Sequence, residues 1–483
     1  MNSSRDSDEG AGWYSTAPGK WKLDVPPGAR PNSWLRPKTL WQSRNDIIAK
    51  WIDPVDAARK RWVELAKPTG GDFVVDRGTD AEYSMLVVGD TGEGDDSQYA
   101  VVPALRAQTG VDFAVICSDV IYPTGDLGDY HYKFFHPYRE LDWPFYAIPG
   151  NHDWYDGLRG FMRIFCGLED DGQRLDFGSG PRAWFARKLW RRNGKVTAEQ
   201  LDEAKRLRSK PSQTSRQPAP YFAIDKGPVR FVCIDTGIGG LVDDEQRAWL
   251  ERVSLENDRP KILLTGKPIY VNGRYRPGGV DDIVRNPKAN YVLAIGGDTH
   301  NYQRYPVRVG DRVIQYVVSG GGGAYLHATH WIPEVDVAGV TEEQFKCYPL
   351  RRDSLARFSQ IIDSKLLFGL GLAVVKPGQA AAYFERHRGI NAQSNRKSDA
   401  KLRRSQRLKA QALGRIRFGH LFHRYGSELF DFNDPPMFKH FLRLDIRADG
   451  LTMTCVGVTG SADTEGTPSV EDKIEVPYVA WRG

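Results

Sequence analysis

Three apolar runs between residues 85 and 151 each stop at an acidic or amide residue followed by turn-forming residues. They read MLVVG, VDFAVIC and WPFYAI. Short runs rich in β-branched residues predict buried strands of a parallel sheet, and the polar segment 97–110 between the first two predicts a crossover helix. Because ligands collect at the carboxyl ends of strands in α/β sheets, we expect Asp90, Asp119 and Asn151 side by side at one edge. Such a set of hard oxygen donors indicates a metal site.

Further apolar runs continue this pattern through the middle of the chain. Segments 221–225 and 229–235 predict paired strands, 244–253 predicts a helix, and 261–270 and 290–305 predict strands ending near Lys267 and Asp298. The glycine loop after the next strand lacks GK[ST], so it is not a Walker loop. Segment 441–458 alternates apolar and polar residues on both sides of a turn, which predicts a hairpin. The fold class is therefore α/β.

The same patterns divide the chain into four parts. Residues 1–80 are an N-terminal arm with helices, and 81–335 are the core, with an insertion at 157–218. Residues 336–425 form an apolar and basic helical insertion, and 426–483 return to the core as a β-hairpin. The insertion at 157–218 directly follows a site loop, so we expect a cap over the cleft, although an exposed helical hairpin fits as well.

Charge and cysteine usage refine this picture. The net charge is +6, but residues 386–417 alone carry +10, which leaves −4 for the remainder. Five scattered cysteines without CxxC spacing are typical of reduced thiols in a cytosolic protein. The N-terminus has no apolar signal region, and the longest uncharged apolar run, 366–375, is shorter than the about 20 residues of a spanning helix. We expect a cytoplasmic protein, with peripheral membrane contact left open.

Five short motifs occur in a fixed order along the core: GDTG, SDVIY, GNHD, TGKP and GDTH. In this order they resemble the calcineurin-like metallophosphoesterases, and the GDxG and GDxxY forms most resemble the purple acid phosphatase branch. The resemblance extends over 85–325. It implies two mixed sheets flanked by helices and a metal-dependent hydrolase of phosphate esters. Bound metals supply such enzymes with hydroxide that attacks phosphorus at neutral pH, and they neutralise the phosphoryl charge.

Carried over residue by residue, the resemblance places a first metal on Asp90, Asp119, Tyr122 and His300. A phenolate ligand favours a trivalent ion, so iron is implied there. The second metal would share Asp119 and use Asn151.

The second metal site departs from the family pattern, because Lys267 and Asp298 replace the two expected histidines. A protonated lysine cannot ligate a metal, but beside carboxylates its charged form is favoured. Three outcomes stay open. A divalent ion (Mn, Zn or Mg) binds through Asp119, Asn151 and Asp298; the site is empty and Lys267 clamps the phosphate; or catalysis is lost.

Three other histidines are candidates for the chemistry. His152 follows Asn151, and the resemblance makes it the proton donor to the leaving group, a role that suits a pKa near neutrality. Asp153 is expected to orient its imidazole. His327 and His330 follow the glycine loop and could reach the cleft, although structural roles are as compatible with their positions.

The basic run 386–417 allows three interpretations: a solvated helix surface, an anionic lipid contact or a nucleic-acid patch. The lipid interpretation gains from the adjacent apolar run 366–375, because apolar insertion together with a polybasic segment anchors proteins to membranes. The run lacks interleaved aromatic residues for base stacking, which makes nucleic acid the weaker interpretation. The alternative to a hydrolase is thus a catalytically silent protein that docks to a membrane or nucleic acid. The sequence does not identify the substrate or the oligomeric state.

Overall fold

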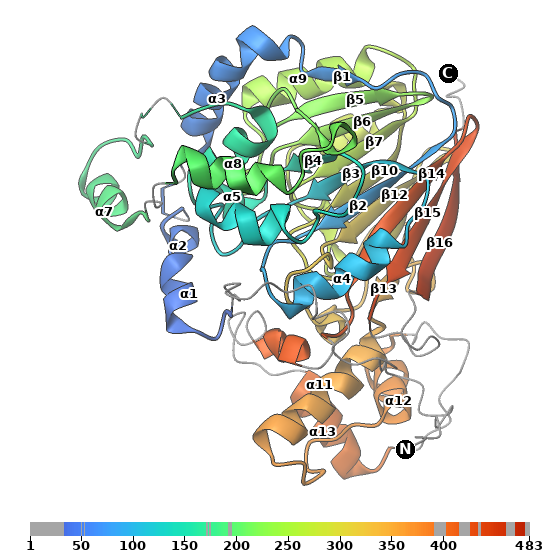
Figure 1. Cartoon of the computed structure of the whole chain (residues 1–483). Helices are drawn as coiled ribbons and strands as arrows, with labels where there is room; N and C mark the ends of the chain where they lie inside the picture. The colour runs from blue at the N-terminus through green and yellow to red at the C-terminus, as the bar shows by residue number, and fades with distance from the viewer. Residues whose placement is uncertain are drawn as a thin grey trace.

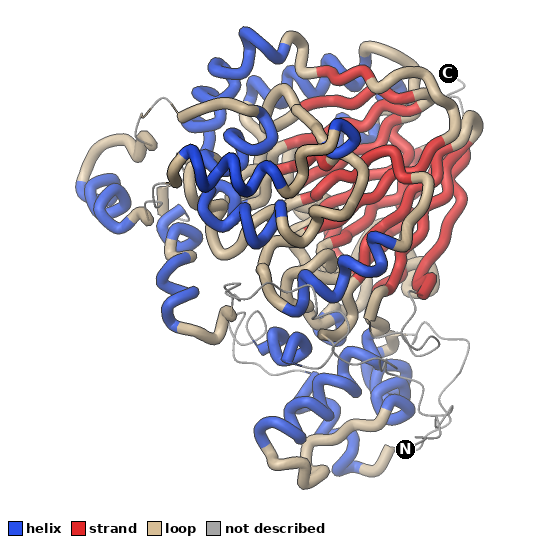
Figure 2. The backbone as a smooth tube through the Cα atoms, viewed as in Figure 1, coloured by secondary structure: helices blue, strands red, loops and turns tan. Residues whose placement is uncertain are grey.

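The computed structural model describes residues 33–49, 51–52, 54–170, 172, 175–191, 196–390, 402–414, 426–432, 436–459 and 469–478. Two mixed β-sheets form the centre of the molecule, and helices lie outside them (Figures 1 and 2). The α/β prediction, with two mixed sheets flanked by helices, is confirmed.

The three apolar runs form parallel strands of a six-stranded sheet with the order β16-β15-β14-β2-β3-β4. The predicted hairpin lies at the other side of β2 and pairs antiparallel with it. The crossover helix after β2 is α4, and it begins at the N-cap Asp95, whose carboxylate accepts a hydrogen bond from the Ser97 N–H. The strands are β2 (Tyr83–Gly89), β3 (Val111–Cys117), β4 (Phe145–Ile148), β14 (His440–Ile446), β15 (Gly450–Gly457) and β16 (Ser469–Pro477).

The second sheet has eight strands in the order β1-β5-β6-β7-β10-β12-β11-β13. It begins earlier than the sequence interpretation placed it, because β1 pairs in parallel with β5 although it lies within the expected N-terminal arm. The strands are β1 (Val74–Asp76), β5 (Phe222–Lys226), β6 (Val229–Ile234), β7 (Lys261–Thr265), β10 (Tyr291–Gly296), β11 (Tyr302–Val309), β12 (Arg312–Ser319) and β13 (Lys346–Tyr348). A separate pair, β8 (Tyr270–Val271) and β9 (Arg274–Tyr275), follows β7.

Alternate side chains of β2 serve two different cores. Met85 and Val87 pack between the sheets, whereas Leu86 and Val88 pack in the cluster that contains the apolar face of α4. This is the period of two that a strand imposes on its side chains. The sheet is covered on both faces, which explains why the runs read as continuously apolar rather than alternating. All five cysteines are buried and none forms a disulfide.

Helices cover the outer faces and the ends of the sheets (Figure 1). Helix α3 of the N-terminal arm is fixed to the core by Arg59, which is buried and paired with Asp235 and Asp243 at 2.7 and 2.8 Å. The helices are α1 (Pro37–Gln42), α2 (Asn45–Ala49), α3 (Val55–Gly70), α4 (Asp96–Arg106), α5 (Asn151–Trp154), α6 (Arg159–Phe161), α7 (Pro181–Leu189), α8 (Ala198–Arg206), α9 (Asp244–Leu255), α10 (Asp281–Arg285), α11 (Arg351–Leu366), α12 (Pro377–Arg388) and α13 (Arg404–Gly414).

Helices α11, α12 and α13 form a lobe at one end of the sheets (Figure 1). The lobe has a small apolar core of its own, which includes Leu355, Tyr383 and Phe384. Of the basic run 386–417, residues 391–401 and 415–417 lie outside the described residues. Among the described residues, no helix is both long enough and apolar enough to span a bilayer.

Candidate metal and phosphate site

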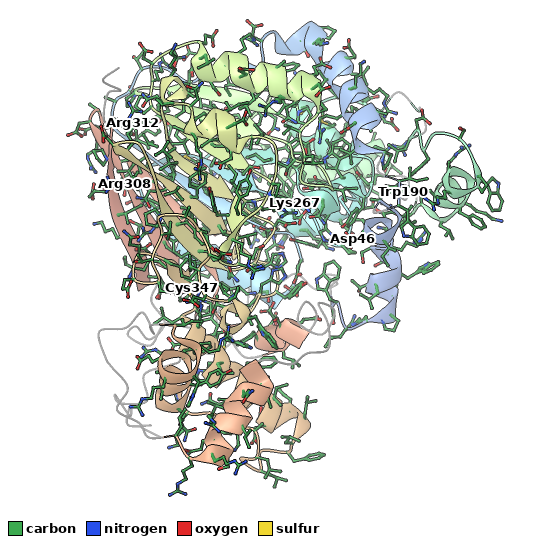
Figure 3. The ribbon with its side chains drawn as sticks, turned by 180° about the vertical axis from the view of Figure 1, so that it is seen from behind. Asp46, Trp190, Lys267, Arg308, Arg312 and Cys347 are labelled. Carbon is green, nitrogen blue, oxygen red and sulfur yellow. The ribbon has the colours of Figure 1, made fainter. Side chains whose placement is uncertain are left out.

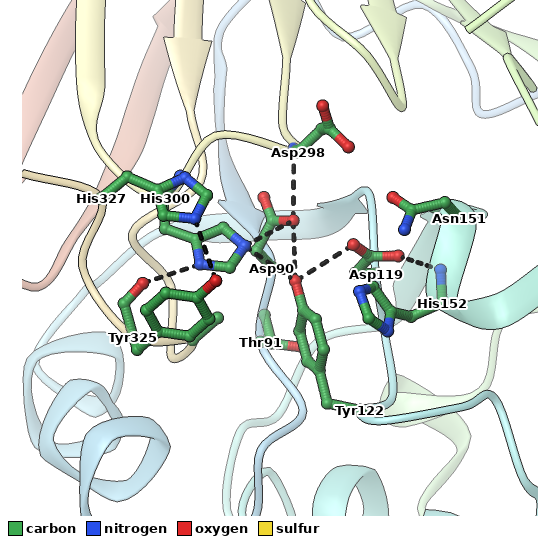
Figure 4. Close-up of polar contacts among 12 residues, drawn as sticks. Asp90, Thr91, Asp119, Tyr122, Asn151, His152, Asp298, His300, Tyr325 and His327 are labelled. Carbon is green, nitrogen blue, oxygen red and sulfur yellow. Dashed lines mark hydrogen bonds and ion pairs between the residues drawn. The ribbon is translucent and has the colours of Figure 1, made fainter. Parts of the chain in front are cut away.

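The loops at the carboxyl ends of four strands supply the predicted site residues. Asp90 follows β2, Asp119 follows β3 and Asn151 follows β4, while Asp298 and His300 follow β10 of the other sheet. Figure 4 shows these side chains gathered around a common centre. These residues therefore lie together at the strand ends, where the sequence interpretation expected them.

The hydroxyl of Tyr122 is the point on which this group converges. Its oxygen lies 3.0 Å from Asp90 Oδ1, 3.1 Å from Asp119 Oδ2 and 3.1 Å from His300 Nε2. Tyr122 comes from the loop after β3, three residues beyond Asp119, so the chain folds back to place both on one centre. Four side chains from three loops thus present three oxygens and one imidazole nitrogen to one another.

Burial governs the protonation of this group. Burial and the charges of Asp119 and Asp298 raise the pKa of Asp90 well above its ordinary value, and burial raises the pKa of Asp119 as well. The pKa of Tyr122 is also raised, by burial and by both carboxylates. Burial and His327 lower the pKa of His300, which keeps its imidazole neutral. A bound cation would favour the charged forms of the carboxylates and the phenol instead.

The residues present fit a cation in donor type. Asp90 Oδ2 is buried and has no hydrogen-bond partner among the described residues, which is costly for a carboxylate oxygen unless a ligand occupies it. Carboxylate, phenol and imidazole are donors that transition metals accept. In the described part of the chain, no group of three or more His, Cys, Asp or Glu side chains alone is positioned to hold a metal ion.

The backbone at the site is held in an uncommon conformation. Asp90, Asp119 and Asp298 have φ angles of +55°, +35° and +61°, in the left-handed region that non-glycine residues rarely adopt. Each such residue costs on the order of 1–3 kcal/mol and is typical of functional sites. Gly150 allows the close approach of two loops, because a Cβ there would lie 2.1 Å from Asp119 Oδ1. These features position the carboxylates at the expense of local stability.

At the position expected for the second metal, a carboxylate is paired with two basic side chains. Asp298 lies between two cations, with Lys267 Nζ 3.4 Å from Oδ1 and an Arg276 nitrogen 3.1 Å from Oδ2. The Asn151 amide nitrogen donates to the Tyr155 hydroxyl at 2.7 Å. Lys267 follows β7 and is labelled in Figure 3. The sequence interpretation placed Lys267 and Asp298 at this site but missed Arg276, which lies just after β9.

His152 is buried beside Tyr122, with ring centroids 4.6 Å apart. Its Nδ1 lies 2.8 Å from the Pro123 carbonyl oxygen, and its backbone N–H donates to Asp119 Oδ1 at 2.8 Å. Because a carbonyl oxygen only accepts, this contact assigns the proton to Nδ1. The histidine is thus fixed by the loop that carries Tyr122.

The Asp153 carboxylate contacts backbone rather than the His152 imidazole. It accepts hydrogen bonds from the N–H groups of Val120, Ile121 and Gly150 at 3.0–3.3 Å. These bonds tie the loop after β3 to the loop after β4. We expected Asp153 to orient the His152 imidazole. In the structure the Pro123 carbonyl contacts the imidazole, and Asp153 fixes the two loops instead.

The two histidines after the glycine loop have different surroundings. His327 stacks on His300, with ring centroids 4.1 Å apart, and its Nδ1 accepts the His300 N–H. His330 lies in the contact between the core and α11, where Nδ1 is 2.8 Å from the Ser354 hydroxyl and the ring packs on Phe358. His327 therefore borders the site, whereas His330 contributes to packing.

Trp34 of the N-terminal arm covers the site, and the sequence interpretation missed it. Its ring lies against His152, Tyr122 and Tyr325, with centroids 5.2, 6.0 and 6.0 Å away. The indole N–H donates to Glu93 at 2.9 Å, and the backbone N–H donates to Glu428 at 3.1 Å. A tryptophan in a Gly- and Pro-rich arm was the only available signal.

The insertion at 157–218 borders the same region without supplying this cover. Arg191 reaches Thr124 and Asp126 in the loop that follows Tyr122, and its backbone N–H donates to Asn45. The predicted role of this insertion as a cap over the cleft stays a prediction.

Comparisons with known proteins give one family match. Residues 83–302 match the family model of the calcineurin-like phosphoesterases. Among solved structures the chain is similar to GAP50, the anchor in the inner membrane complex of Plasmodium, at 10% identity and a TM-score of 0.41, covering 82% of this chain and 89% of that one. It is also similar to PhoD, at 10% identity and a TM-score of 0.39, covering 83% and 70%. It is similar to TT1561 of Thermus thermophilus at 14% identity and a TM-score of 0.26, covering 50% of this chain and 89% of that one. No curated protein sequence matches this chain.

Proposed function

We propose that the chain is a metal-dependent hydrolase of phosphate esters, because residues 83–302 match the family model of the calcineurin-like phosphoesterases. The observation that carries the proposal is the convergence of Asp90, Asp119 and His300 on the Tyr122 oxygen at 3.0–3.1 Å. A structural polar cluster would satisfy all its buried atoms, yet Asp90 Oδ2 has no hydrogen-bond partner among the described residues.

In this proposal the first cation is held by Asp90, Asp119, Tyr122 and His300. The Tyr122 phenolate favours iron, as in the purple acid phosphatase branch that the motifs resemble. When bound, the cation supplies activated water at neutral pH and neutralises charge on the phosphoryl oxygens. His300 is prepared for this role, because its Nδ1 faces the Tyr325 carbonyl at 2.7 Å and its Nε2 faces the cluster.

Lys267 and Arg276 take the place of the second cation in our proposal. Both are cations beside Asp298, at 3.4 and 3.1 Å, and together they exceed its single negative charge. The excess positive charge would bind a phosphate oxygen, since charge-assisted hydrogen bonds are the strong ones. Arg276 thereby adds a residue to the predicted Lys267 clamp, and a divalent ion on Asp119, Asn151 and Asp298 is the alternative.

His152 would donate the proton to the leaving group. Its Nδ1 proton is directed to the Pro123 carbonyl, so the imidazolium form would donate its Nε2 proton to the leaving group and become neutral. The backbone bond from His152 to Asp119 ties the position of this ring to the cation site. Asp153 supports both by fixing the two loops.

Metal analysis combined with turnover tests the proposal. Protein purified with iron, manganese or zinc is assayed with p-nitrophenyl phosphate and its bis ester, and the ions bound per chain are counted. We expect one tightly bound ion and turnover that depends on it. Asp119→Asn keeps the side-chain volume and an acceptor for the His152 N–H, and should lose both the ion and turnover. Pure protein with neither ion nor turnover would refute the proposal.

A catalytically silent docking protein is the second candidate, favoured by a specific surface feature. The lobe of α11–α13 carries an exposed apolar loop, and we propose that 366–417 contacts an anionic membrane. The replacement Lys267→His discriminates between the candidates. A large rise in turnover together with a second bound ion would show that the two-metal mechanism is suppressed in this chain.

A further inference from the structure

The end of α11 and the loop that leads to α12 expose four large apolar side chains. Leu366, Phe368, Leu370 and Leu372 are 57%, 90%, 68% and 62% exposed. The residues 368–372 are all exposed, and glycines at 369 and 371 separate the apolar side chains. We call residues 366–372 the apolar tip. A patch of this kind on a protein surface is typical of an interaction site.

Hydrogen bonds hold the apolar tip in its exposed shape. The Asp363 carboxylate accepts the Gly371 and Ala373 N–H groups, both at 2.8 Å, and the Asp363 carbonyl accepts the Gly369 N–H at 2.8 Å. Phe368 has a φ of +54°, which bends the chain at the most exposed residue. One aspartate at the end of α11 thus positions the whole loop, and the exposure belongs to a defined turn.

The lobe does not need these side chains for its own core. Its buried cluster is built mainly from the three helices, including Leu355, Phe384 and Ala410, and takes Val375 but none of the exposed residues from the loop. Between them, Leu367 is half-buried and packs against the main core, and Ala373 is buried. The outward residues therefore remain available to a partner.

Cations lie beside the apolar tip and elsewhere on the lobe. Lys409 of α13 donates to the Gly371 carbonyl at 3.3 Å, and Lys365 and Lys376 flank the loop in the chain. Over the described residues 351–390 and 402–414, eleven Lys or Arg face three Asp or Glu. Leu408, between Arg407 and Lys409, is 52% exposed and extends the apolar surface. Positive charge around an apolar wedge is complementary to a surface of anionic headgroups over acyl chains.

We propose that the apolar tip inserts into membranes that contain anionic phospholipid, with the surrounding lysines and arginines on the headgroups. This inference rests on the proposed membrane contact of 366–417 and names the element that makes it. A nucleic acid would use the cations but leave four apolar side chains in water, so it fits only half of the surface. The insertion is peripheral, because the loop is far shorter than a spanning segment.

Vesicle sedimentation tests this inference with the full chain. Wild-type protein is mixed with vesicles of phosphatidylcholine alone or with phosphatidylserine added. We expect binding at least ~10-fold tighter to the anionic vesicles, and a loss of at least ~10-fold in Phe368→Ser/Leu370→Ser, since burying such side chains drives interfacial binding. Leu255→Ser at the exposed end of α9 is the matched control and should bind like wild type. Both leucines and Phe368 are exposed, so thermal melting should be unchanged.

Two further readouts separate the possible failures. The fluorescence of the tryptophan in Phe368→Trp should shift to the blue when anionic vesicles are added, and no shift should occur in their absence. Retained vesicle binding by the serine variant would overturn the role of the apolar tip while leaving a purely electrostatic membrane contact. Binding of wild type to an oligonucleotide but not to vesicles, or dimerisation that the serine variant abolishes, would overturn the inference in favour of nucleic acid or a second copy. Turnover of p-nitrophenyl phosphate, measured in the same samples, reports separately on the proposed hydrolase.

Discussion

Replacement of Lys267 by methionine should lower catalysis far more than stability. The side chain becomes one heavy atom shorter and loses its charge. In the folded protein Lys267 is 3.4 Å from Asp298, and Arg276 still neutralises this carboxylate at 3.1 Å after the change. The Lys267 and Asp298 side chains are 12% and 20% exposed, so the pair is partly screened. We expect the free energy of unfolding to fall by only about 0.5–1 kcal/mol.

The effect on the reaction is estimated from the lost phosphate contact. A hydrogen bond to a charged group contributes about 1.5–3 kcal/mol. That loss corresponds to a decrease in kcat/KM of roughly 10–150-fold, because every 1.4 kcal/mol is tenfold. Lys267→Arg should retain most of the activity, since the charge is kept. These values apply to protein loaded with the same ion as wild type.

Saturation kinetics with p-nitrophenyl phosphate measure this effect, with metal content determined on each preparation. Lys210→Met is the matched control, because Lys210 pairs with Asp142 on the surface, where both side chains are more than half exposed. It should change neither kcat/KM nor the melting temperature. Unchanged kcat/KM in Lys267→Met at equal metal content would refute the clamp, and a rise in kcat/KM would assign Lys267 an inhibitory role instead.

Three other perturbations give independent tests. Tyr122→Phe should lose the visible phenolate charge-transfer absorption of iron-loaded protein, and unchanged absorbance would remove Tyr122 from the ligand set. Trp34→Ala should destabilise the fold by up to about 3–5 kcal/mol, the range for buried tryptophans, and increase modification of His152 by diethyl pyrocarbonate; an unchanged rate would show that Trp34 does not shield the ring. Burial raises the pKa of Asp95 to about 7, so the native state retains a proton that the unfolded state loses near pH 4, and stability falls as pH rises from about 4 to 7. Asp95→Asn keeps the cap on Ser97 and should flatten this fall by up to about 4 kcal/mol in thermal melts, whereas an unchanged slope would contradict the assignment.

The strand-end residues could be predicted because the information is local. Each apolar run ends directly at its functional residue, and the geometry of a parallel sheet brings those ends to one edge. Asp90 and Asp119, separated by 29 residues in the chain, could be placed together by this argument alone. The prediction of the hairpin at 441–458 succeeded for the same reason, since period and turn occur within one short segment.

Residues that reach the site from distant segments escaped prediction. The contact between Trp34 and Glu428 joins positions 394 residues apart, and neither segment shows a period that would indicate it. Arg276 follows a two-residue strand, which is too short to read from a pattern. Asp153 was assigned to the adjacent imidazole because sequence proximity suggested it, yet three backbone N–H groups satisfy its carboxylate. Tertiary contacts, rather than local preference, decide such roles.

In our proposal, four side chains from neighbouring loops bind one cation. Anomalous X-ray scattering from crystals of the iron-loaded protein measures this directly, since it locates and identifies each bound ion. Our account expects one strong iron peak in contact with Asp90, Asp119, Tyr122 and His300, with Lys267 and Arg276 beside Asp298 and no second ion of equal occupancy. An iron peak elsewhere, or crystals of active protein without an ion between these four side chains, would contradict it.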